Sequence, residues 1–476
     1  MLFNSVDFAI FLPLVFLLYW FVTATNLKLQ NLLIVAASYI FYGWWDWRFL
    51  SLLLFSTLVD YLIGILLSKQ KTQHKRKLLL WLSIAVNLGF LGFFKYFNFF
   101  IANFVAAFSF FGVPFSHQSL SIILPVGISF YTFQTLSYTI DIYKRKLEPT
   151  KDFIAFAAYV SFFPQLVAGP IERATNLLPQ FYKKRHFDYE KAADGMRQIL
   201  WGLFKKVVVA DNAALIVNEV FDTYESQSGI NLLIGAIFFS FQIYGDFSGY
   251  SDIAIGTSRL FGFDLKRNFN YPYFSRDIAE FWRRWHISLS TWFRDYLYIP
   301  LGGSQGKTSF KVRNTFIIFI VSGFWHGANW TFLFWGFLNA VFFIPLLLNN
   351  KNRTHLEITA QANFFPNATD FYKIIKTFLM TTLMWLFFRS LSIGDAFLYL
   401  KLLFSPSLFV MPSVSLFPFL FILVLLVIEW FSRKKQHGLE LSQLENKNYR
   451  RLVYLFIIIM LILFRAKSQS FIYFQF

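Results

Sequence analysis

The sequence predicts an all-helical protein that crosses a membrane many times. Of its 476 residues, 56% are hydrophobic and only 15% are charged, whereas the surface of a soluble domain needs about a quarter of its residues to be charged. Apolar stretches that approach the roughly 20 residues of a membrane-crossing helix recur along the whole chain. These two observations exclude a soluble protein and indicate a polytopic one.

About a dozen segments are candidates for such helices. The clearest are residues 8–25, 29–43, 49–67, 78–96, 120–142, 231–244, 314–347, 371–388, 416–431 and 452–464. Residues 314–347 are long enough for two helices. The shorter or more polar segments are expected to be tilted, broken or re-entrant, and residues 153–170 fit a re-entrant hairpin.

Other architectures fit poorly. A transmembrane β-barrel needs segments of roughly 10 residues that alternate polar and apolar side chains, and the runs of leucine and phenylalanine here do not alternate. The chain has no cysteine, which excludes a disulfide scaffold and a thiol nucleophile. The abundance of apolar residues excludes disorder.

Basic loops predict the orientation, because loops rich in lysine and arginine stay in the cytoplasm. Residues 69–77 and 144–146 are such loops, and residues 112–119 between them carry no lysine or arginine and fit an extracytoplasmic turn. Counting back through the spans places the N-terminus outside the cytoplasm. The first segment has no early basic residues, so we expect it to remain in the mature protein.

The net charge of +18 is explained by this bias and by contact with anionic lipid headgroups. Nucleic acid is not an expected partner, because the basic residues are scattered among the spans. We expect one membrane domain over residues 1–476, with transmembrane helices at 1–143, a motif-rich core at 144–347 and further transmembrane helices at 348–476. In the core, residues 197–209 resemble an interfacial helix from which Lys205 and Lys206 snorkel toward the headgroups.

Two segments of the core are rich in functional side chains. One is expected to form a helix from about Asp277 that pairs Glu280 with Arg284 and places His286 on one face with Ser290. The other contains His326, which on a continuous helix shares a face with Ser322, Asn329 and Trp330. An ionisable residue at membrane depth is usually functional, although either histidine can instead be a neutral residue bonded to a backbone carbonyl.

Several catalytic motifs are absent from the sequence. The stretch that ends in Gly306, Lys307 and Thr308 has Leu301 where a phosphate-binding loop requires its first glycine. Thr291 stands where a histidine-four-residues-aspartate acyltransferase requires aspartate, and neither a serine elbow nor a zinc-protease motif occurs. We expect no metal site. Histidine acid–base chemistry in a sheltered site, acting on a hydroxyl that attacks a thioester, remains available.

Five stretches resemble the membrane-bound O-acyltransferase family, in its bacterial branch for alginate O-acetylation and teichoic acid D-alanylation. They are FFPQLVAGP at 162–170, YGDFSGYSDIAIG at 244–256, the segment 271–303 that ends in RDYLYIPLGG, GFWHGANW at 323–330 and FIYFQF at 471–476. The similarity extends over essentially the whole chain. One departure is Gly245, where a bulkier residue is expected, which affects local packing only.

The resemblance implies a ring of about 11 transmembrane helices around a thin catalytic centre in a bacterial cytoplasmic membrane. It implies that His326 is the principal catalytic residue, that His286 is a second active-site histidine, and that acyl groups pass from a cytoplasmic donor to an extracytoplasmic acceptor. Acetyl-CoA is the expected donor and a surface polysaccharide, alginate-like or peptidoglycan, the expected acceptor. A separate extracytoplasmic acetyltransferase is the implied partner. The residues expected to bind substrate are Arg267, Arg276, Arg283, Arg284, Asp246, Asp252, Asn329 and Trp330.

Each of these roles has an alternative. The arginines, expected to hold coenzyme A phosphates, would equally form a basic surface bound to lipid headgroups. Asp246 and Asp252 either orient the site or bond to helix ends. Transfer of D-alanine from a carrier protein uses the same histidine chemistry, although the longer segment around His286 favours acetylation. A transporter or channel without catalysis also fits broken helices, although such folds often contain repeats and none is found.

Overall fold

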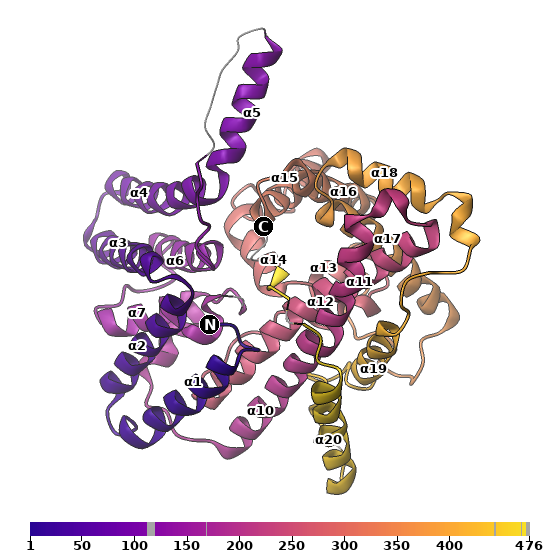
Figure 1. Cartoon of the computed structure of the whole chain (residues 1–476). Helices are drawn as coiled ribbons and strands as arrows, with labels where there is room; N and C mark the ends of the chain where they lie inside the picture. Colours follow the sequence, from indigo (N-terminus) through magenta and orange to yellow (C-terminus); the bar gives the residue numbers. More distant parts are fainter. Residues whose placement is uncertain (112–119, 168, 442–443, 468, 473–476) are drawn as a thin grey trace. The chain divides into compact units, whose positions relative to one another are not determined.

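The computed structural model of the chain describes residues 1–111, 120–167, 169–441, 444–467 and 469–472. Within these ranges the secondary structure is helical and contains no strand, which confirms the predicted fold class (Figure 1). The predicted turn at 112–119, residue 168 of one matched motif and residues 473–476 of another lie outside the described residues. The chain divides into two compact units, residues 1–192 with 258–265, and residues 193–257 with 266–476.

The first unit begins with long helices and ends with short ones. They are α1 (Val6–Leu17), α2 (Leu27–Asp46), α3 (Leu50–Lys69), α4 (Gln73–Leu91), α5 (Phe97–Phe110), α6 (Ile128–Tyr143), α7 (Phe153–Ser161), α8 (Phe163–Leu166) and α9 (Ala174–Leu177). Helices α3, α4 and α6 pack side by side (Figure 1). Helices α7 and α8 are shorter than the roughly 20 residues that a span requires, as expected for a broken segment.

A buried carboxylate joins three helices of this unit. Asp60 of α3 accepts hydrogen bonds from Ser83 Oγ and Asn87 Nδ2 of α4, at 2.5 and 2.8 Å, and from Thr139 Oγ1 of α6 at 3.2 Å. All four side chains are buried. Because lipid offers no hydrogen-bond partner, this polar cluster holds the three helices in one register.

The second unit contains the later helices. Helix α10 (Tyr189–Leu203) enters it from the first unit, and the last residues of α12 return to the first unit. The others are α11 (Asp211–Asp222), α12 (Gly229–Leu260), α13 (Ile278–Arg284), α14 (Ile287–Phe293), α15 (Thr308–His326), α16 (Trp330–Leu348), α17 (Ala368–Arg389), α18 (Ile393–Leu403), α19 (Pro418–Phe431) and α20 (Lys447–Leu463). The short helix α13 packs against α14, α16 and α17.

The membrane-spanning prediction holds in outline. Five helical segments of the described chain are long and apolar enough to cross a membrane: Leu27–Lys69, Gln73–Phe110, Gly229–Leu260, Trp330–Leu348 and Ala368–Arg389. The predicted division of residues 314–347 into two helices is confirmed by α15 and α16. The predicted span 120–142 is wrong at its start, because Gly127 at φ +75° delays α6 until Ile128.

The predicted snorkelling of Lys205 and Lys206 is also wrong. Both side chains are buried in the π-helical turn Phe204–Ala210 that follows α10. Lys205 pairs with Asp252, and Lys206 Nζ lies 2.8 Å from a carboxylate oxygen of Asp246 and 2.8 Å from one of Asp211. Neither ammonium group therefore reaches the lipid headgroups. Each is instead paired with a carboxylate inside the protein, and this ion pair offsets the cost of removing the charge from water.

Glycines bring α15 and α16 into close contact. A Cβ atom added at Gly323 of α15 would collide with the backbone carbonyl oxygen of Phe332 in α16, and one at Gly336 would collide with that of Phe319 in α15. The two helices therefore approach backbone to backbone, as small residues allow in membranes. This packing fixes His326, which ends α15.

We predict that Gly323→Ala destabilises the protein. The added methyl group meets backbone atoms that cannot rotate away, and such overpacking costs about 1–3 kcal/mol. Gly89→Ala is the matched control, because Gly89 also lies within a helix but has nothing within 4 Å of an added Cβ. Thermal unfolding in detergent should show a lower midpoint for Gly323→Ala alone. Equal midpoints for the two variants would contradict the packing role.

Candidate active site

The structure brings the two predicted histidines together around one indole ring. The ring centroid of Trp325 lies 5.9 Å from that of His286 and 4.9 Å from that of His326. Both imidazoles meet the indole edge to face, with interplanar angles of 67° and 79°. His286 is 1% exposed and His326 is 3% exposed, so both lie in one sheltered site.

Aromatic rings form the walls of this site. Trp335 of α16 and Phe388 of α17 each lie 5.3 Å from the His326 ring. The ring of Phe247 in α12 lies 4.6 Å from that of His286. Such walls exclude water and lower the local dielectric constant, which strengthens any hydrogen bond that the imidazoles form with a reacting group.

His286 does not lie on a continuous helix, so the predicted helix from Asp277 through His286 to Ser290 is wrong. Helix α13 ends at Arg284 and α14 begins at Ile287, and His286 between them adopts left-handed backbone angles of φ 42° and ψ 54°. Residues 268–270 form the backbone hydrogen bonds of this turn in place of a helix. Ile287 N–H donates to the Asn268 carbonyl at 2.8 Å, and Asn270 N–H donates to the Arg284 carbonyl at 2.9 Å.

The predicted pairing within α13 is confirmed. Arg284 Nη2 lies 2.6 Å from Glu280 Oε1, four residues earlier. Arg276 binds the other oxygen of the same carboxylate through its Nε at 3.0 Å. Glu280 thus holds two guanidinium groups just before the His286 turn.

The predicted common face of His326, Asn329 and Trp330 is wrong, because α15 ends at His326 and α16 begins at Trp330. Asn329 caps α16, where its Oδ1 accepts the Thr331 N–H at 3.1 Å and its Nδ2 donates to the Leu391 carbonyl at 2.9 Å. Trp330 is 55% exposed. Of the expected companions, only Ser322 shares the helix of His326.

A large cavity is lined by residues that flank the two histidines in the sequence. Its volume is about 630 Å³, and α13, α14, α15, α16 and the loop after α16 line it. Ile287 and Ser322 are lining residues, of which the first follows His286 in sequence and the second precedes His326 by one helical turn. The cavity therefore extends up to the neighbours of both imidazoles.

Three arginines line this cavity, namely Arg283, Arg294 and Arg353. Only Arg283 was among the arginines selected from the sequence. Arg294 lies within the matched motif at 271–303, so the motif could have indicated it as a site residue. Arg353 lies in the loop after α16, where no sequence pattern indicated it.

The four predicted arginines already have partners within the protein. Arg276 and Arg284 bind Glu280. Arg267 donates from Nε to the Phe269 carbonyl and from Nη1 to the Lys435 carbonyl, at 2.6 and 3.0 Å. Arg283 donates to the carbonyls of Asn352 and His355, at 2.7 Å each. These bonds position loops, and phosphate binding by the four arginines stays a prediction.

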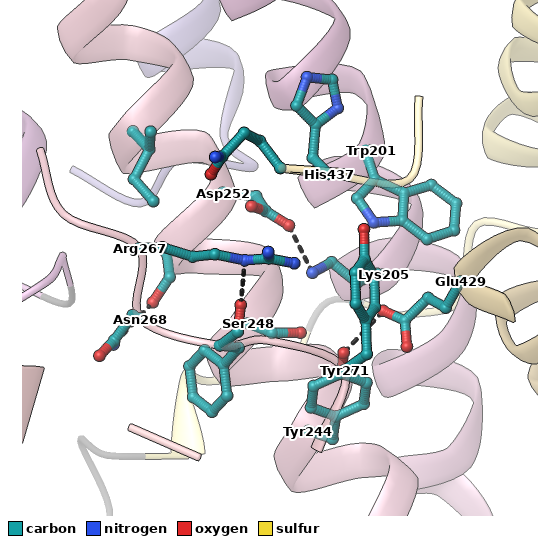
Figure 2. Close-up of a pocket in the computed structure, with 14 residues that line it drawn as sticks. Trp201, Lys205, Tyr244, Ser248, Asp252, Arg267, Asn268, Tyr271, Glu429 and His437 are labelled. Atoms are coloured by element: carbon teal, nitrogen blue, oxygen red, sulfur yellow. Dashed lines mark hydrogen bonds and ion pairs between the residues drawn. The ribbon is translucent and has the colours of Figure 1, made fainter. Parts of the chain in front are cut away.

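Asp252 lines a second, small polar cavity (Figure 2). Its volume of about 10 Å³ is close to the space that one water molecule requires. Figure 2 shows Lys205 and Asp252, which form an ion pair, pointing toward one another. Beside them, the Tyr244 hydroxyl donates to Glu429 Oε1 at 2.6 Å. Opposite charges thus neutralise one another around this cavity.

Asp246 holds the C-terminal segment. Its Oδ2 accepts the backbone N–H of Ile472 at 2.7 Å, and its partner Lys206 donates to the Gln469 carbonyl at 3.1 Å. The Phe471 ring then packs 6.0 Å from Phe247, the ring that contacts His286. Asp246 therefore orients backbone that adjoins the site.

Gly245, the departure from the family pattern, lies where α12 closely approaches the π-helical turn. A Cβ atom there would lie 2.9 Å from the carbonyl oxygen of Lys205 and 3.3 Å from Cβ of Ala210. A bulkier residue would not fit this contact. Glycine thus suits the local packing.

Comparison with known proteins decides the family. Residues 39–390 match the sequence model of MBOAT, the membrane-bound O-acyltransferase family. The chain belongs to the membrane-bound O-acyltransferase family. Membership favours acyl transfer over the transporter alternative.

Relatives within the membrane-bound O-acyltransferase family include enzymes of polymer acetylation. The chain is 44% identical to the probable alginate O-acetylase AlgI of Azotobacter vinelandii over 336 residues, which are 70% of this chain and 66% of the relative, slightly under two thirds of its length. It is 37% identical to the peptidoglycan O-acetyltransferase of Helicobacter pylori over 84% of this chain and 79% of the relative. The teichoic acid D-alanyltransferase of Streptococcus thermophilus is 31% identical over 45% of this chain and 55% of the relative.

We predict a pH effect on stability from His286, which lies outside the five spanning segments. Burial lowers the pKa of His286 to about 3 from its ordinary value of 6.5. As the pH falls below about 6.5, the unfolded chain binds a proton here that the native protein does not, so stability decreases. His286→Asn should therefore lose less stability between pH 7 and pH 4 than the unmodified protein.

Thermal unfolding in detergent at several pH values measures this difference. His74→Asn, at an exposed position of α4, is the control for loss of a histidine. Parallel pH profiles for His286→Asn and the unmodified protein would contradict the assignment.

Proposed function

We propose that the chain is a membrane O-acetyltransferase that takes acetyl groups from acetyl-CoA for O-acetylation of an alginate-like polysaccharide or peptidoglycan. The observation that carries this proposal is the pair of buried histidines together with an arginine-lined cavity whose wall includes Ile287 and Ser322, their neighbours on the chain. The relatives from Azotobacter vinelandii and Helicobacter pylori, a probable alginate O-acetylase and a peptidoglycan O-acetyltransferase, suggest the acetyl group and the class of acceptor.

The large cavity suits coenzyme A as the carrier of the acetyl group. Its volume of about 630 Å³ falls in the usual range of about 300–1,000 Å³ for ligand pockets. Aromatic side chains such as Trp282 and Phe319 line it together with the three arginines. Guanidinium groups would bind the phosphates, since they form paired hydrogen bonds with phosphate oxygens. The pantetheine arm would then extend along the apolar wall toward Ser322.

The histidines would act on the proton of the acceptor hydroxyl. In the proposed step the hydroxyl oxygen bonds to the thioester carbonyl carbon while a neutral imidazole, that of His326, takes the hydroxyl proton. The carbon–sulfur bond then breaks, and the proton passes from the imidazolium to the sulfur, which leaves as the thiol of coenzyme A. General acid–base catalysis of this kind contributes about 10²- to 10⁴-fold in rate. His286, the second histidine, would bond to the reacting groups.

The sidedness follows from the basic loops. Lysine and arginine at 69–77 and 144–146 favour a cytoplasmic position for these loops and an N-terminus outside the cytoplasm. In a bacterial cytoplasmic membrane, acetyl-CoA would then be bound from the inside and the acceptor reached from the outside. A separate extracytoplasmic acetyltransferase would complete the transfer to the polysaccharide, as the family resemblance implies.

D-alanyl transfer from a carrier protein is the second candidate. The D-alanyltransferase of Streptococcus thermophilus covers 45% of this chain, against 84% for the Helicobacter pylori acetyltransferase. The acetylation relatives therefore account for more of the sequence. Retention of an acyl carrier protein, with no reaction of acetyl-CoA, would favour D-alanyl transfer instead.

We predict that His326→Ala abolishes acetyl transfer, with a loss of at least about 100-fold. Membranes that contain the protein, its partner and its polymer would be given labelled acetyl-CoA, and label on the polymer would be counted. His74→Ala, at an exposed position, is the control and should transfer normally. Transfer by His326→Ala at the rate of the unmodified protein would overturn the proposed function.

We predict that Arg294→Gln and Arg353→Gln each raise KM for acetyl-CoA by about tenfold or more, because a hydrogen bond to a charged group contributes about 1.5–3 kcal/mol. kcat should change little, since neither side chain adjoins the histidines in sequence. Arg48→Gln removes an exposed arginine paired with Asp46 in the first unit and serves as the control. Unchanged KM values in both cavity variants would place the phosphates elsewhere.

A further inference from the structure

One buried amide, that of Asn268, organises the turn at His286. The carbonyl oxygen Oδ1 of Asn268 lies 3.1 Å from Nδ1 of His286. The same oxygen accepts hydrogen bonds from the Ser288 backbone N–H at 3.3 Å and from Ser288 Oγ at 2.9 Å. The Asn268 side chain is 0% exposed, so these bonds form away from solvent.

The backbone bond identifies which end of the amide faces His286. A backbone N–H can only donate, so the Asn268 atom that it meets must be the oxygen. The amide nitrogen then faces the other way, where Nδ2 donates to Ser251 Oγ of α12 at 3.1 Å. A reversed amide would place two donors against one another at Ser288. The orientation of the Asn268 amide is thus fixed by Ser288 and not by His286, so it can be used to infer the tautomer of His286.

The oxygen cannot donate, so Nδ1 of His286 must carry the proton in their shared hydrogen bond. A neutral imidazole has one N–H group, and burial keeps His286 neutral near pH 7. The remaining nitrogen, Nε2, then holds the lone pair that accepts a proton or a hydrogen bond.

We propose that Asn268 is a positioning residue that sets the tautomer of His286, so that Nε2 is the proton-accepting atom which this histidine offers to the reaction. The use of Nε2 in catalysis rests on the proposed function. The tautomer of His286 does not depend on it. Asn268 contacts the imidazole and acts on the reaction through it.

Asn268 also holds the strained backbone that aims the ring. His286 has left-handed angles, which are unfavourable for a residue with a side chain. Asn268 bonds to both residues that follow, through its backbone oxygen to Ile287 N–H and through Oδ1 to Ser288 N–H. One residue thus fixes both the direction of the ring and the position of its proton.

A neutral amide suits this position better than a carboxylate. A carboxylate would accept the same bonds but would stabilise the imidazolium, which cannot accept a proton. The carboxylates Asp252 and Glu429, which line the small cavity together with Asn268, are bonded to Lys205 and Tyr244 respectively. Asp252 is therefore neutralised by a lysine and Glu429 accepts a hydrogen bond from a phenol, and neither bond involves the His286 imidazole.

Nitrogen-15 NMR of the full-length protein with labelled histidine tests the tautomer directly. The two neutral tautomers have different nitrogen shifts, and comparison with His286→Gln identifies the His286 signals. We expect a protonated Nδ1 and an unprotonated Nε2 at pH 7, in protein without any acyl donor. A protonated Nε2 would overturn the proposal and would leave the proposed function standing.

Two variants test the role of Asn268. Asn268→Leu should mix the tautomers and reduce acetyl transfer by at least about tenfold, less than the 10²- to 10⁴-fold of complete acid–base catalysis because part of the population keeps the active tautomer. Asn268→Asp should keep Nδ1 protonated and raise the pH at which His286 takes up a second proton. Asn231→Leu, which removes another buried amide, bonded to Ser413, should leave the His286 signals unchanged.

The outcomes separate the two proposals. An unchanged tautomer in folded Asn268→Leu would overturn the role of Asn268, whatever its activity. Absence of acetyl transfer in the unmodified protein, with the expected tautomer present, would overturn the proposed function alone.

Discussion

A polar group buried in a membrane protein must find its partner inside the protein, because lipid offers none. This requirement explains how the second unit places its histidines. Glu280 neutralises Arg276 and Arg284 just before the His286 turn, Asn268 bonds across the turn, and Lys206 with Asp246 holds the C-terminal segment against Phe247 through Phe471. Buried polar bonds thus position rings that are otherwise surrounded by aromatic side chains.

The resulting site combines features that acyl transfer to a hydroxyl requires. Its imidazoles are sheltered from water, which would compete with the acceptor for the thioester. The adjoining cavity offers apolar walls for a flexible arm and guanidinium groups for phosphates. The α15–α16 contact at Gly323 and Gly336 keeps His326 at a fixed place, one helical turn after the cavity-lining Ser322, so the proposed role of His326 depends on helix packing as well as on the imidazole.

Much of the fold could be predicted from the sequence because spanning helices carry a local signal, their length and apolar composition. The same signal divided residues 314–347 correctly into α15 and α16. Local sequence patterns gave wrong predictions where the conformation or burial of a residue depends on a partner far away in the sequence. The break at His286 depends on Asn268, which lies 18 residues earlier, and the burial of Lys206 depends on Asp246. The spacing of residues along a helix does not reveal which distant side chain will bond to His286 or Lys206. The motifs identified the two histidines but did not indicate the turn between α13 and α14.

A structure with a non-hydrolysable thioether analogue of acetyl-CoA would show whether the two histidines and the cavity form one acetyl-transfer site, because it locates both ends of the donor in one measurement. We predict phosphate density beside Arg294 and Arg353 and the acetyl end beside Ser322, within about 3–4 Å of a histidine ring nitrogen. Density for the analogue outside this cavity, or with its acetyl end remote from both His286 and His326, would contradict the claim that these residues form an acetyl-transfer site.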